Sequence, residues 1–363
     1  KDHIAAISFG GAPMDFSFEK NVGAILHMYL GGQAVGESVA DLISGEVNPS
    51  GKLAETIPFS EKDTPAWRYF APPNDDVEYR ESIFVGYRYY ETFHVPVKYP
   101  FGYGLSYTSF SYSELNVPEV YSGGKIQIRF KIKNIGKVSG AEIAQLYICP
   151  IESDVIRSHI ELKGFQKIYL HPGEEKEVIL ELDERSFSVY DVEKKAFSML
   201  SGKYQICIGA SVHDLQLKAN MEVVGNSYFR NERELFPDYF REQPHGMEIS
   251  AEQFYQLLGG EPKHDKEKKR GEYTVYDSYQ DVVNVSMFGK IVRGVVHIGL
   301  KIILRGKSER DPAFKMVKMG VEEGNLEGLI ATSGGIATPK LIDMLVYNAN
   351  KKYLQALKRL LKK

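Results

Sequence analysis

Two carboxylates and one arginine lie close together in an aromatic segment of the sequence. Glu78 and Glu81 flank the pair Tyr79 and Arg80. Paired carboxylates can supply a nucleophile and an acid, and a neighbouring guanidinium keeps a carboxylate ionised, which suits the nucleophile better than the acid. Loop hydrogen bonds and ion pairs are the competing role, which we favour for Arg80 and Glu81. Tyr79, Arg80 and Glu81 stand as candidates for substrate binding, and no residue is assigned a catalytic role.

Tyrosines are concentrated in the same segment. The chain holds 23 Tyr and 19 Phe but a single Trp. A tyrosine ring offers both an apolar surface and a polar hydroxyl, so Tyr79, Tyr87 and Tyr89 could line the rim of a polar binding site. Packing in a core or between domains is the alternative, and we favour it.

No other group of reactive side chains stands out. His94, His159 and His245 have no serine or cysteine partner at a recognisable spacing. Cys149 and Cys207 lie in apolar runs and are too few for a disulfide framework, so we expect buried free thiols, with a single bridge left open. No metal-ligand spacing occurs. The sequence therefore indicates neither a metal nor another cofactor.

Charge is distributed unevenly along the chain, whose net charge is −3. Residues 263–363 carry 20 Lys and Arg against 11 Asp and Glu, a net of +9, and residues 1–262 carry 25 against 37, a net of −12. A basic tail of this kind suggests binding to nucleic acid or to a membrane. It can also pack on the acidic first part of its own chain, and we favour this second interpretation. No run of 18 uncharged apolar residues and no signal peptide occur, so we expect a cytoplasmic protein that binds no nucleic acid.

Short alternating elements must position the candidate residues in the first part of the chain. The apolar run 4–9 predicts a buried strand, and apolar residues at helical spacing predict a helix over 35–44 that ends at Gly45. A turn at 48–51 leads to a predicted strand over 52–57. Residues 59–80 form a polar, proline-rich loop, and 83–90 is predicted to be an aromatic strand. We interpret residues 1–107 as the carboxy-terminal part of an α/β sandwich domain.

The hydrophobic pattern changes to period two after about residue 108. Residues 125–133 alternate between polar and apolar types, as in a half-buried strand. Glycine and proline turns separate the other candidate strands, which are 142–149, 161–170, 176–182, 187–190, 203–209 and 215–223. Residues 108–225 are therefore predicted to form a β-sandwich of the fibronectin type III kind.

The last part of the chain is charged and then helical. Residues 226–272 are predicted to be a charged linker, and residues 273–363 a helical extension whose last helix covers 338–361. A helix over 287–306 carries a basic column beside a wide apolar surface. That pattern is typical of a helix buried on two sides or of one lying on a membrane, and we favour packing. The fold class is thus multi-domain α+β.

Three segments together resemble the β-glucosidases of glycoside hydrolase family 3. They are 29–58 (YLGGQAVGESVADLISGEVNPSGKLAETIP), 79–108 with its YRESIFVGYRYY and YPFGYGLSYT stretches, and 161–173 (ELKGFQKIYLHPG). Ala54 departs from the family, which often has proline there. The resemblance covers about residues 4–223, and the tail from Gly271 more loosely resembles an extension of some bacterial members.

The resemblance implies retaining hydrolysis of terminal β-linked glucosides by two carboxylates about 5–5.5 Å apart. In the family the nucleophile is an aspartate on a separate (β/α)8 barrel, and the acid/base is commonly a glutamate in a Glu-Gly-x-Asp-Arg type stretch. Neither motif occurs in residues 1–363. We therefore expect this chain to complete the sugar site of a barrel in the same enzyme and to be inactive alone.

Two alternatives remain open. The chain could be a stand-alone carbohydrate-binding or interaction module built on the sandwich. It could also belong to a β-xylosidase or an N-acetylglucosaminidase of the same family, since those differ mainly in the barrel. The sequence does not indicate an oligomeric state.

Overall fold

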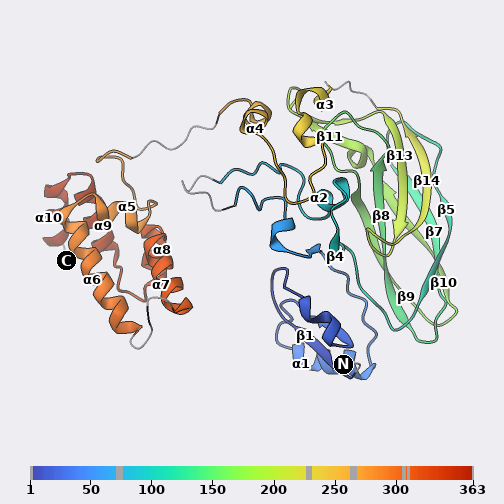
Figure 1. Ribbon diagram of the computed structural model, residues 1–363, viewed down its shortest axis with the longest axis horizontal. Coiled ribbons are helices and arrows are strands. Elements are labelled where there is room, and N and C mark those ends of the chain that lie inside the picture. The colour runs from blue at the N-terminus through green and yellow to red at the C-terminus, as the bar shows by residue number, and fades with distance from the viewer. Residues whose placement is uncertain are drawn as a thin grey trace. The chain divides into compact units, whose positions relative to one another are not determined.

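The computed structural model describes residues 3–70, 77–225, 231–261, 268–304, 308 and 311–361 (Figure 1). The chain divides into two compact units, Lys1–Pro262 and Lys263–Lys363. Each unit is described by itself. The mixture of sheets and helices confirms the multi-domain α+β class predicted from the sequence.

The first unit begins with a small α/β piece. Strands β1 (Ala5–Ser8) and β2 (Ala24–His27) pair in parallel, with the 3-10 helix η1 (Ser17–Asn21) between them. Helix α1 (Val35–Ser44) ends at Gly45, whose φ of 82° lies in the left-handed region that glycine adopts without strain. The predicted strand and helix are confirmed. The predicted strand over 52–57 shrinks to β3 (Ile57–Pro58), which pairs with β4 (Val97–Tyr99).

The aromatic strand predicted over 83–90 is wrong, because α2 (Tyr87–Thr92) is a helix. It follows Gly86, whose φ is 54°. A helix places residues three and four apart on one face, so Tyr89, Tyr90 and Phe93 pack together into one aromatic core, which a strand would divide between two faces.

The β-sandwich predicted over 108–225 is present (Figure 1). One sheet has the order β6-β14-β13-β8-β9 and the other the order β10-β7-β5. Their bounds are β5 Phe110–Asn116, β6 Val120–Tyr121, β7 Ile126–Asn134, β8 Gly140–Pro150, β9 Glu161–Leu170, β10 Glu175–Leu182, β13 Gly202–Gly209 and β14 Leu215–Val223. The 3-10 helix η3 (Glu184–Phe187) precedes the small hairpin of β11 (Ser188–Asp191) and β12 (Ala196–Met199). Inward residues such as Ile128, Phe130 and Ile206 are at most 1% exposed.

Residues 231–261 correct the predicted linker over 226–272, because they are folded. Helices α3 (Glu232–Leu235) and α4 (Ala251–Leu258) flank the 3-10 helix η4 (Pro237–Tyr239). We call residues 231–261 the return segment. Five of its apolar side chains are buried in the same core as α2: Phe236, Tyr239, Met247, Ile249 and Phe254. Residues 226–230 and 262–267 of the predicted linker lie outside the described residues.

The second unit is a helical bundle with its own apolar core. Its helices are α5 Tyr279–Asn284, α6 Met287–Ile303, α7 Pro312–Glu322, α8 Leu326–Thr332, α9 Pro339–Ala349 and α10 Tyr353–Leu361. The single helix predicted over 338–361 is therefore two helices, separated near Lys351, whose φ is 59°. Among the described residues, no helix has both the length and the apolar character needed to cross a membrane.

Candidate functional site

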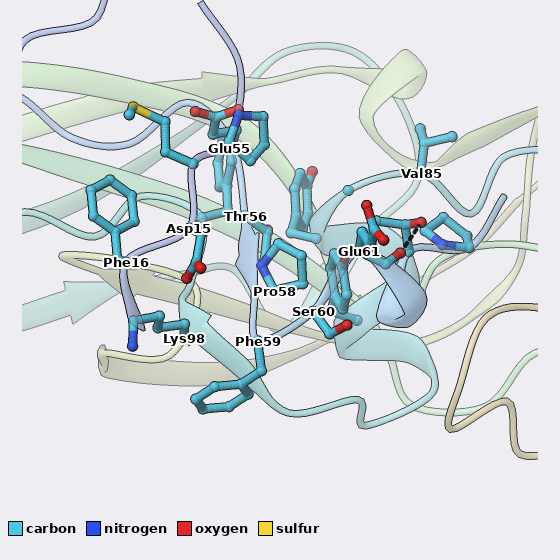
Figure 2. A pocket seen from close by; sticks show the side chains of 18 of the residues that line it. Asp15, Phe16, Glu55, Thr56, Pro58, Phe59, Ser60, Glu61, Val85 and Lys98 are labelled. Atoms are coloured by element: carbon cyan, nitrogen blue, oxygen red, sulfur yellow. Dashed lines mark hydrogen bonds between the residues drawn. The ribbon is translucent and has the colours of Figure 1, made fainter. Parts of the chain in front are cut away.

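An open cleft of about 1040 Å³ lies in the first unit, between the α/β piece and α2. Its walls come from four stretches of chain, residues 13–17, 54–65, 85–90 and 98–101. Figure 2 shows Asp15 on one of these stretches and Glu55 and Glu61 on another. The 3-10 helix η2 (Glu61–Asp63), capped by the Ser60 hydroxyl, forms part of one wall.

Several polar atoms at the wall of this cleft are buried and lack hydrogen-bond partners within the described part of the chain. They are Glu55 Oε1, Thr56 Oγ1 and Arg88 Nε. A buried polar group without a partner costs about 1–3 kcal/mol, so such atoms usually mark a missing ligand, water or protein segment. The cleft therefore offers acceptors and a donor to a polar molecule.

A salt bridge fixes the edge of the cleft beside β4. Lys98 Nζ lies 2.6 Å from Glu19 Oε1, and the Tyr99 hydroxyl donates to Glu19 Oε2 at 2.6 Å. The hydrogen bond from Lys98, assisted by that from Tyr99, holds the pKa of Glu19 below its usual value. Lys98 is thus held by a protein carboxylate at this edge.

Tyr79, Arg80 and Glu81, which were predicted to bind substrate, do not line this cleft, whereas Tyr87, a candidate for the rim of a binding site, does. Tyr79 is 71% exposed. Arg80 takes the loop role that we favoured: its Nε donates to Glu78 at 2.6 Å and its Nη1 to the Ile249 carbonyl at 2.8 Å. Substrate binding by these residues stays a prediction.

Glu81 behaves differently from the ionised carboxylate that a neighbouring arginine would produce. Its side chain is 4% exposed, and Oε2 has no hydrogen-bond partner within the described residues. Burial raises the pKa of Glu81, which favours the protonated carboxyl. Arg80 does not keep Glu81 ionised, because it pairs with Glu78 instead.

The cleft residues Asp15, Glu55 and Arg88 were not predicted from the sequence. More than 70 residues separate the first of them from the last, and no local sequence pattern links the three. Arg88 and Glu55 lie within segments that the sequence singled out, 79–108 and 29–58, but neither residue was chosen as a candidate.

A second open cleft, of about 1340 Å³, lies beside the sandwich and contains His94 and His159. Their ring centroids are 6.0 Å apart, and burial, with a smaller contribution from His94, lowers the pKa of His159. Arg157 in the same cleft is 6% exposed and donates to the Tyr204 hydroxyl at 2.9 Å. These contacts form no nucleophile–base pair, in line with the ordinary role expected for the histidines.

The cysteines and the possible metal ligands are the remaining polar features. The free Cys149 and Cys207 are buried with their sulfurs 3.8 Å apart, as expected for free thiols. Among the described residues, no group of three or more His, Cys, Asp or Glu side chains is arranged to hold a metal ion.

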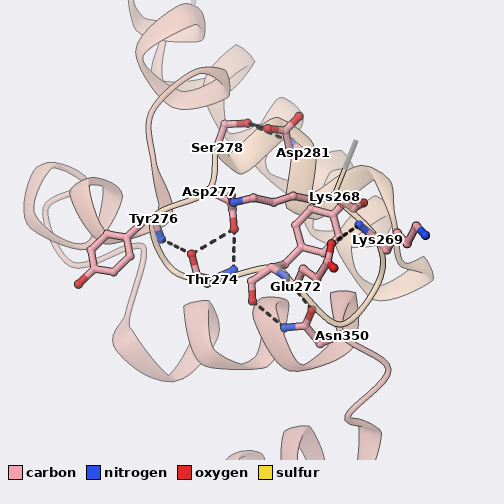
Figure 3. Close-up of polar contacts among 10 residues, drawn as sticks. Lys268, Lys269, Glu272, Thr274, Tyr276, Asp277, Ser278, Asp281 and Asn350 are labelled. Carbon is pink, nitrogen blue, oxygen red and sulfur yellow. Dashed lines mark hydrogen bonds and ion pairs between the residues drawn. The ribbon is translucent and has the colours of Figure 1, made fainter. Parts of the chain in front are cut away.

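The second unit contains a polar cluster around Asp277 and Asn350 (Figure 3). Asp277 accepts from the Thr274 amide at 2.6 Å and pairs with Lys268. Burial alone would raise the pKa of Asp277, but the hydrogen bonds from Lys268 and Thr274 hold it below its usual value. Asn350 accepts from the Tyr273 amide at 2.9 Å and donates to the Tyr273 carbonyl at 2.7 Å. The cluster is internally satisfied, so it fixes the start of the bundle to α9 and α10.

Comparison with known proteins agrees with this architecture. Residues 2–107 match the glycosyl hydrolase family 3 C-terminal domain, and residues 142–212 match a fibronectin type III-like domain. Thermostable beta-glucosidase B of Acetivibrio thermocellus is 44% identical over 61% of this chain and 30% of its own length. An exo-alpha-(1->6)-L-arabinopyranosidase of Bifidobacterium breve is 36% identical over 61% of this chain and 29% of its own length.

A solved structure shows the same relationship. The GH3 beta-glucosidase of Bifidobacterium adolescentis superposes with a TM-score of 0.60 at 35% identity, covering 62% of this chain and 34% of that one. The chain thus spans about a third of the length of these relatives. Its α/β piece and sandwich correspond to the two matched domains, and this part of the chain is accordingly similar to the carboxy-terminal portion of family 3 glycoside hydrolases.

Proposed function

We propose that this chain completes the sugar site of a retaining glycoside hydrolase of the β-glucosidase type. The observation that carries the proposal is the cleft of about 1040 Å³ whose wall buries Glu55, Thr56 and Arg88 atoms that have no hydrogen-bond partner among the described residues. Sugar hydroxyls both donate and accept hydrogen bonds, so they can satisfy carboxylate, hydroxyl and guanidinium groups together.

The role of the chain in such an enzyme is positioning and water exclusion. The carboxylates that break the glycosidic bond would belong to the barrel and to the Glu-Gly-x-Asp-Arg type stretch, neither of which occurs in residues 1–363. Arg88 and Glu55 would then bind hydroxyls away from the reacting carbon. Binding energy from such remote groups orients the sugar for reaction.

The identity of the sugar is not decided by this region. A beta-glucosidase and an arabinopyranosidase each align with 61% of the chain. A glucoside is proposed because the most similar relative cited above carries the glucosidase name at 44% identity. Xylosides and N-acetylglucosaminides remain competing substrates.

The proposal is tested with the 363-residue chain itself. It should show no turnover of an aryl β-glucoside, because it lacks both expected carboxylate motifs. Equilibrium titration should detect weak glucose binding, with a Kd on the order of millimolar, that is reduced by Arg88→Met. Turnover by a clean preparation would contradict the scaffold role, and the absence of any glucose binding would contradict the cleft assignment.

One observation favours the stand-alone binding module as a second candidate. Phe165 and Tyr169 project from the same face of β9, and they are 66% and 55% exposed. Exposed aromatic rings are a common surface for stacking on sugars. Titration with a gluco-oligosaccharide should distinguish the two sites, because Phe165→Ala would weaken binding on the sandwich while leaving the cleft intact.

A further inference from the structure

Helix α6 presents two different apolar stripes. Phe288, Val292 and Val296, spaced four apart, pack against the core of the second unit, and Leu300 on the same side is buried. Its other stripe is not covered by the described residues of the second unit: Met287, Ile291, Val295, Ile298 and Ile302 are 84%, 61%, 65%, 61% and 67% exposed. Residues spaced four, four, three and four apart lie along one side of a helix. A continuous exposed stripe of this kind marks an interaction surface.

A basic column runs beside the exposed stripe. Lys290, Arg293, His297 and Lys301 are spaced three, four and four apart, so they share the neighbouring side of α6. Residues 287–303 contain no Asp or Glu. The charge that faces outward along the whole helix is therefore of one sign.

Helix α10 repeats this composition in the same unit. Leu354, Leu357 and Leu361 are 76%, 54% and 75% exposed. Its last turn contains Lys358 and Arg359, and the helix has no acidic residue, although Arg359 pairs with Asp343 of α9 at 2.7 Å. Two helices of the bundle thus combine exposed aliphatic side chains with basic ones.

A second copy of the chain fits the α6 surface poorly. Pairing two exposed stripes would bring two basic columns together, and α6 offers no carboxylate to neutralise either one. Like charges placed opposite each other destabilise such an interface. The 17 residues of α6 span about 25 Å, so the helix is short for crossing a bilayer but suited to lying on one.

We propose that α6 binds the surface of an anionic membrane. The aliphatic stripe from Met287 to Ile302 would enter the boundary between headgroups and acyl chains, and the basic column would contact lipid phosphates. Each Lys or Arg near an anionic surface contributes about 1 kcal/mol, and this attraction weakens with salt. The proposal reverses the sequence-based preference for packing, because one stripe of α6 already serves the bundle core while the other stays exposed.

The test is co-sedimentation of the full 363-residue chain with lipid vesicles. Vesicles of phosphatidylcholine mixed with phosphatidylserine should bind the chain several-fold more than phosphatidylcholine alone, and added sodium chloride should reduce the difference. Substituting both Ile291→Ser and Val295→Ser should lower the bound fraction about tenfold, because two inserted aliphatic groups are lost. Circular dichroism would verify that the variant keeps its helices.

A matched control uses Ile336→Ser, which changes an equally exposed residue (68%) outside the stripe and should bind like the unchanged chain. Failure of the unchanged chain to bind the anionic vesicles would overturn the proposal. So would equal binding by the Ile291 and Val295 double variant. If the unchanged chain does not bind vesicles and the double variant alters the oligomeric state measured by light scattering, the surface is an interface between copies.

Discussion

The β-sandwich and the α/β piece of the first unit differ in how completely they bury side chains and pair their buried polar groups. In the sandwich, two sheets close on each other, and buried polar groups such as Asn134 find partners on Thr108, Val138 and Leu170, although the Tyr112 hydroxyl on β5 has none among the described residues. In the α/β piece, α1 buries no residue, and several polar atoms at the cleft wall have no partner in the described part of the chain. A satisfied core identifies a structural element, whereas unsatisfied polar atoms beside a cleft identify the place where another molecule or segment is needed.

The largest loss of stability should come from truncating a side chain in the sandwich core. Phe130 is 1% exposed, so Phe130→Ala should lower the free energy of unfolding by about 3–5 kcal/mol through lost burial and a cavity. Phe165→Ala removes the same ring from an exposed site and should change it by less than about 1 kcal/mol. Urea denaturation of both variants measures the difference, and equal losses would refute the assignment of the core.

Two buried threonines should respond in opposite directions to the same substitution. Thr108 Oγ1 donates to Asn134 at 2.7 Å, so Thr108→Val should destabilise the protein by about 1–3 kcal/mol. Thr56 Oγ1 is buried without a partner in the described residues, so Thr56→Val should stabilise it by up to about 1 kcal/mol. Thermal unfolding should separate the two variants. A loss at Thr56 equal to that at Thr108 would mean that the cleft wall is already satisfied.

Smaller effects should appear in the pH dependence of stability. Burial raises the pKa of Glu81, so the folded state binds more protons than the unfolded state. The contribution of Glu81 to stability is therefore present below the ordinary glutamate pKa of about 4.3. It is lost as the pH rises through the raised pKa. Glu81→Gln should remove that loss. The stability difference between variant and unchanged chain, followed by urea denaturation across acidic pH, measures it.

Glu19 provides the control of opposite sign. Its hydrogen bonds from Lys98 and Tyr99 lower its pKa, so its contribution is present above the ordinary pKa and lost as pH falls through the lowered value. Glu19→Gln should therefore matter most near neutral pH. Parallel curves for the two variants would exclude the different environments described for these carboxylates.

Local pattern explains which parts of the fold could be predicted. The strand predicted over 125–133 was located to within one residue, as β7, because apolar and polar residues alternate along it. The helix α2 was missed because a short aromatic run has no period that distinguishes a helix from a strand. The folded segment 231–261 was missed because Phe236, Met247 and Phe254 are anchors separated by turns and charges, and only tertiary packing joins them.

The same reasoning explains the limits at the candidate site. Tyr79, Arg80 and Glu81 were chosen because they are adjacent, yet Arg80 pairs within its own loop and Glu81 is buried. Asp15 and Glu55 meet at the cleft through the paths of separate segments. Adjacency in sequence is a local property, whereas a cleft is assembled by topology.

The return segment that covers α2 has a consequence for the order of folding. The Tyr89 hydroxyl donates to the Gln243 carbonyl at 2.7 Å and accepts from the Gly246 amide at 3.0 Å, across more than 150 residues of chain. During synthesis, the complete sequence of the sandwich emerges before these partners do, and contacts of such long range form slowly. The aromatic side chains around α2 therefore stay uncovered until residues 236–254 have been synthesised, which leaves them open to chaperone binding or aggregation during that interval.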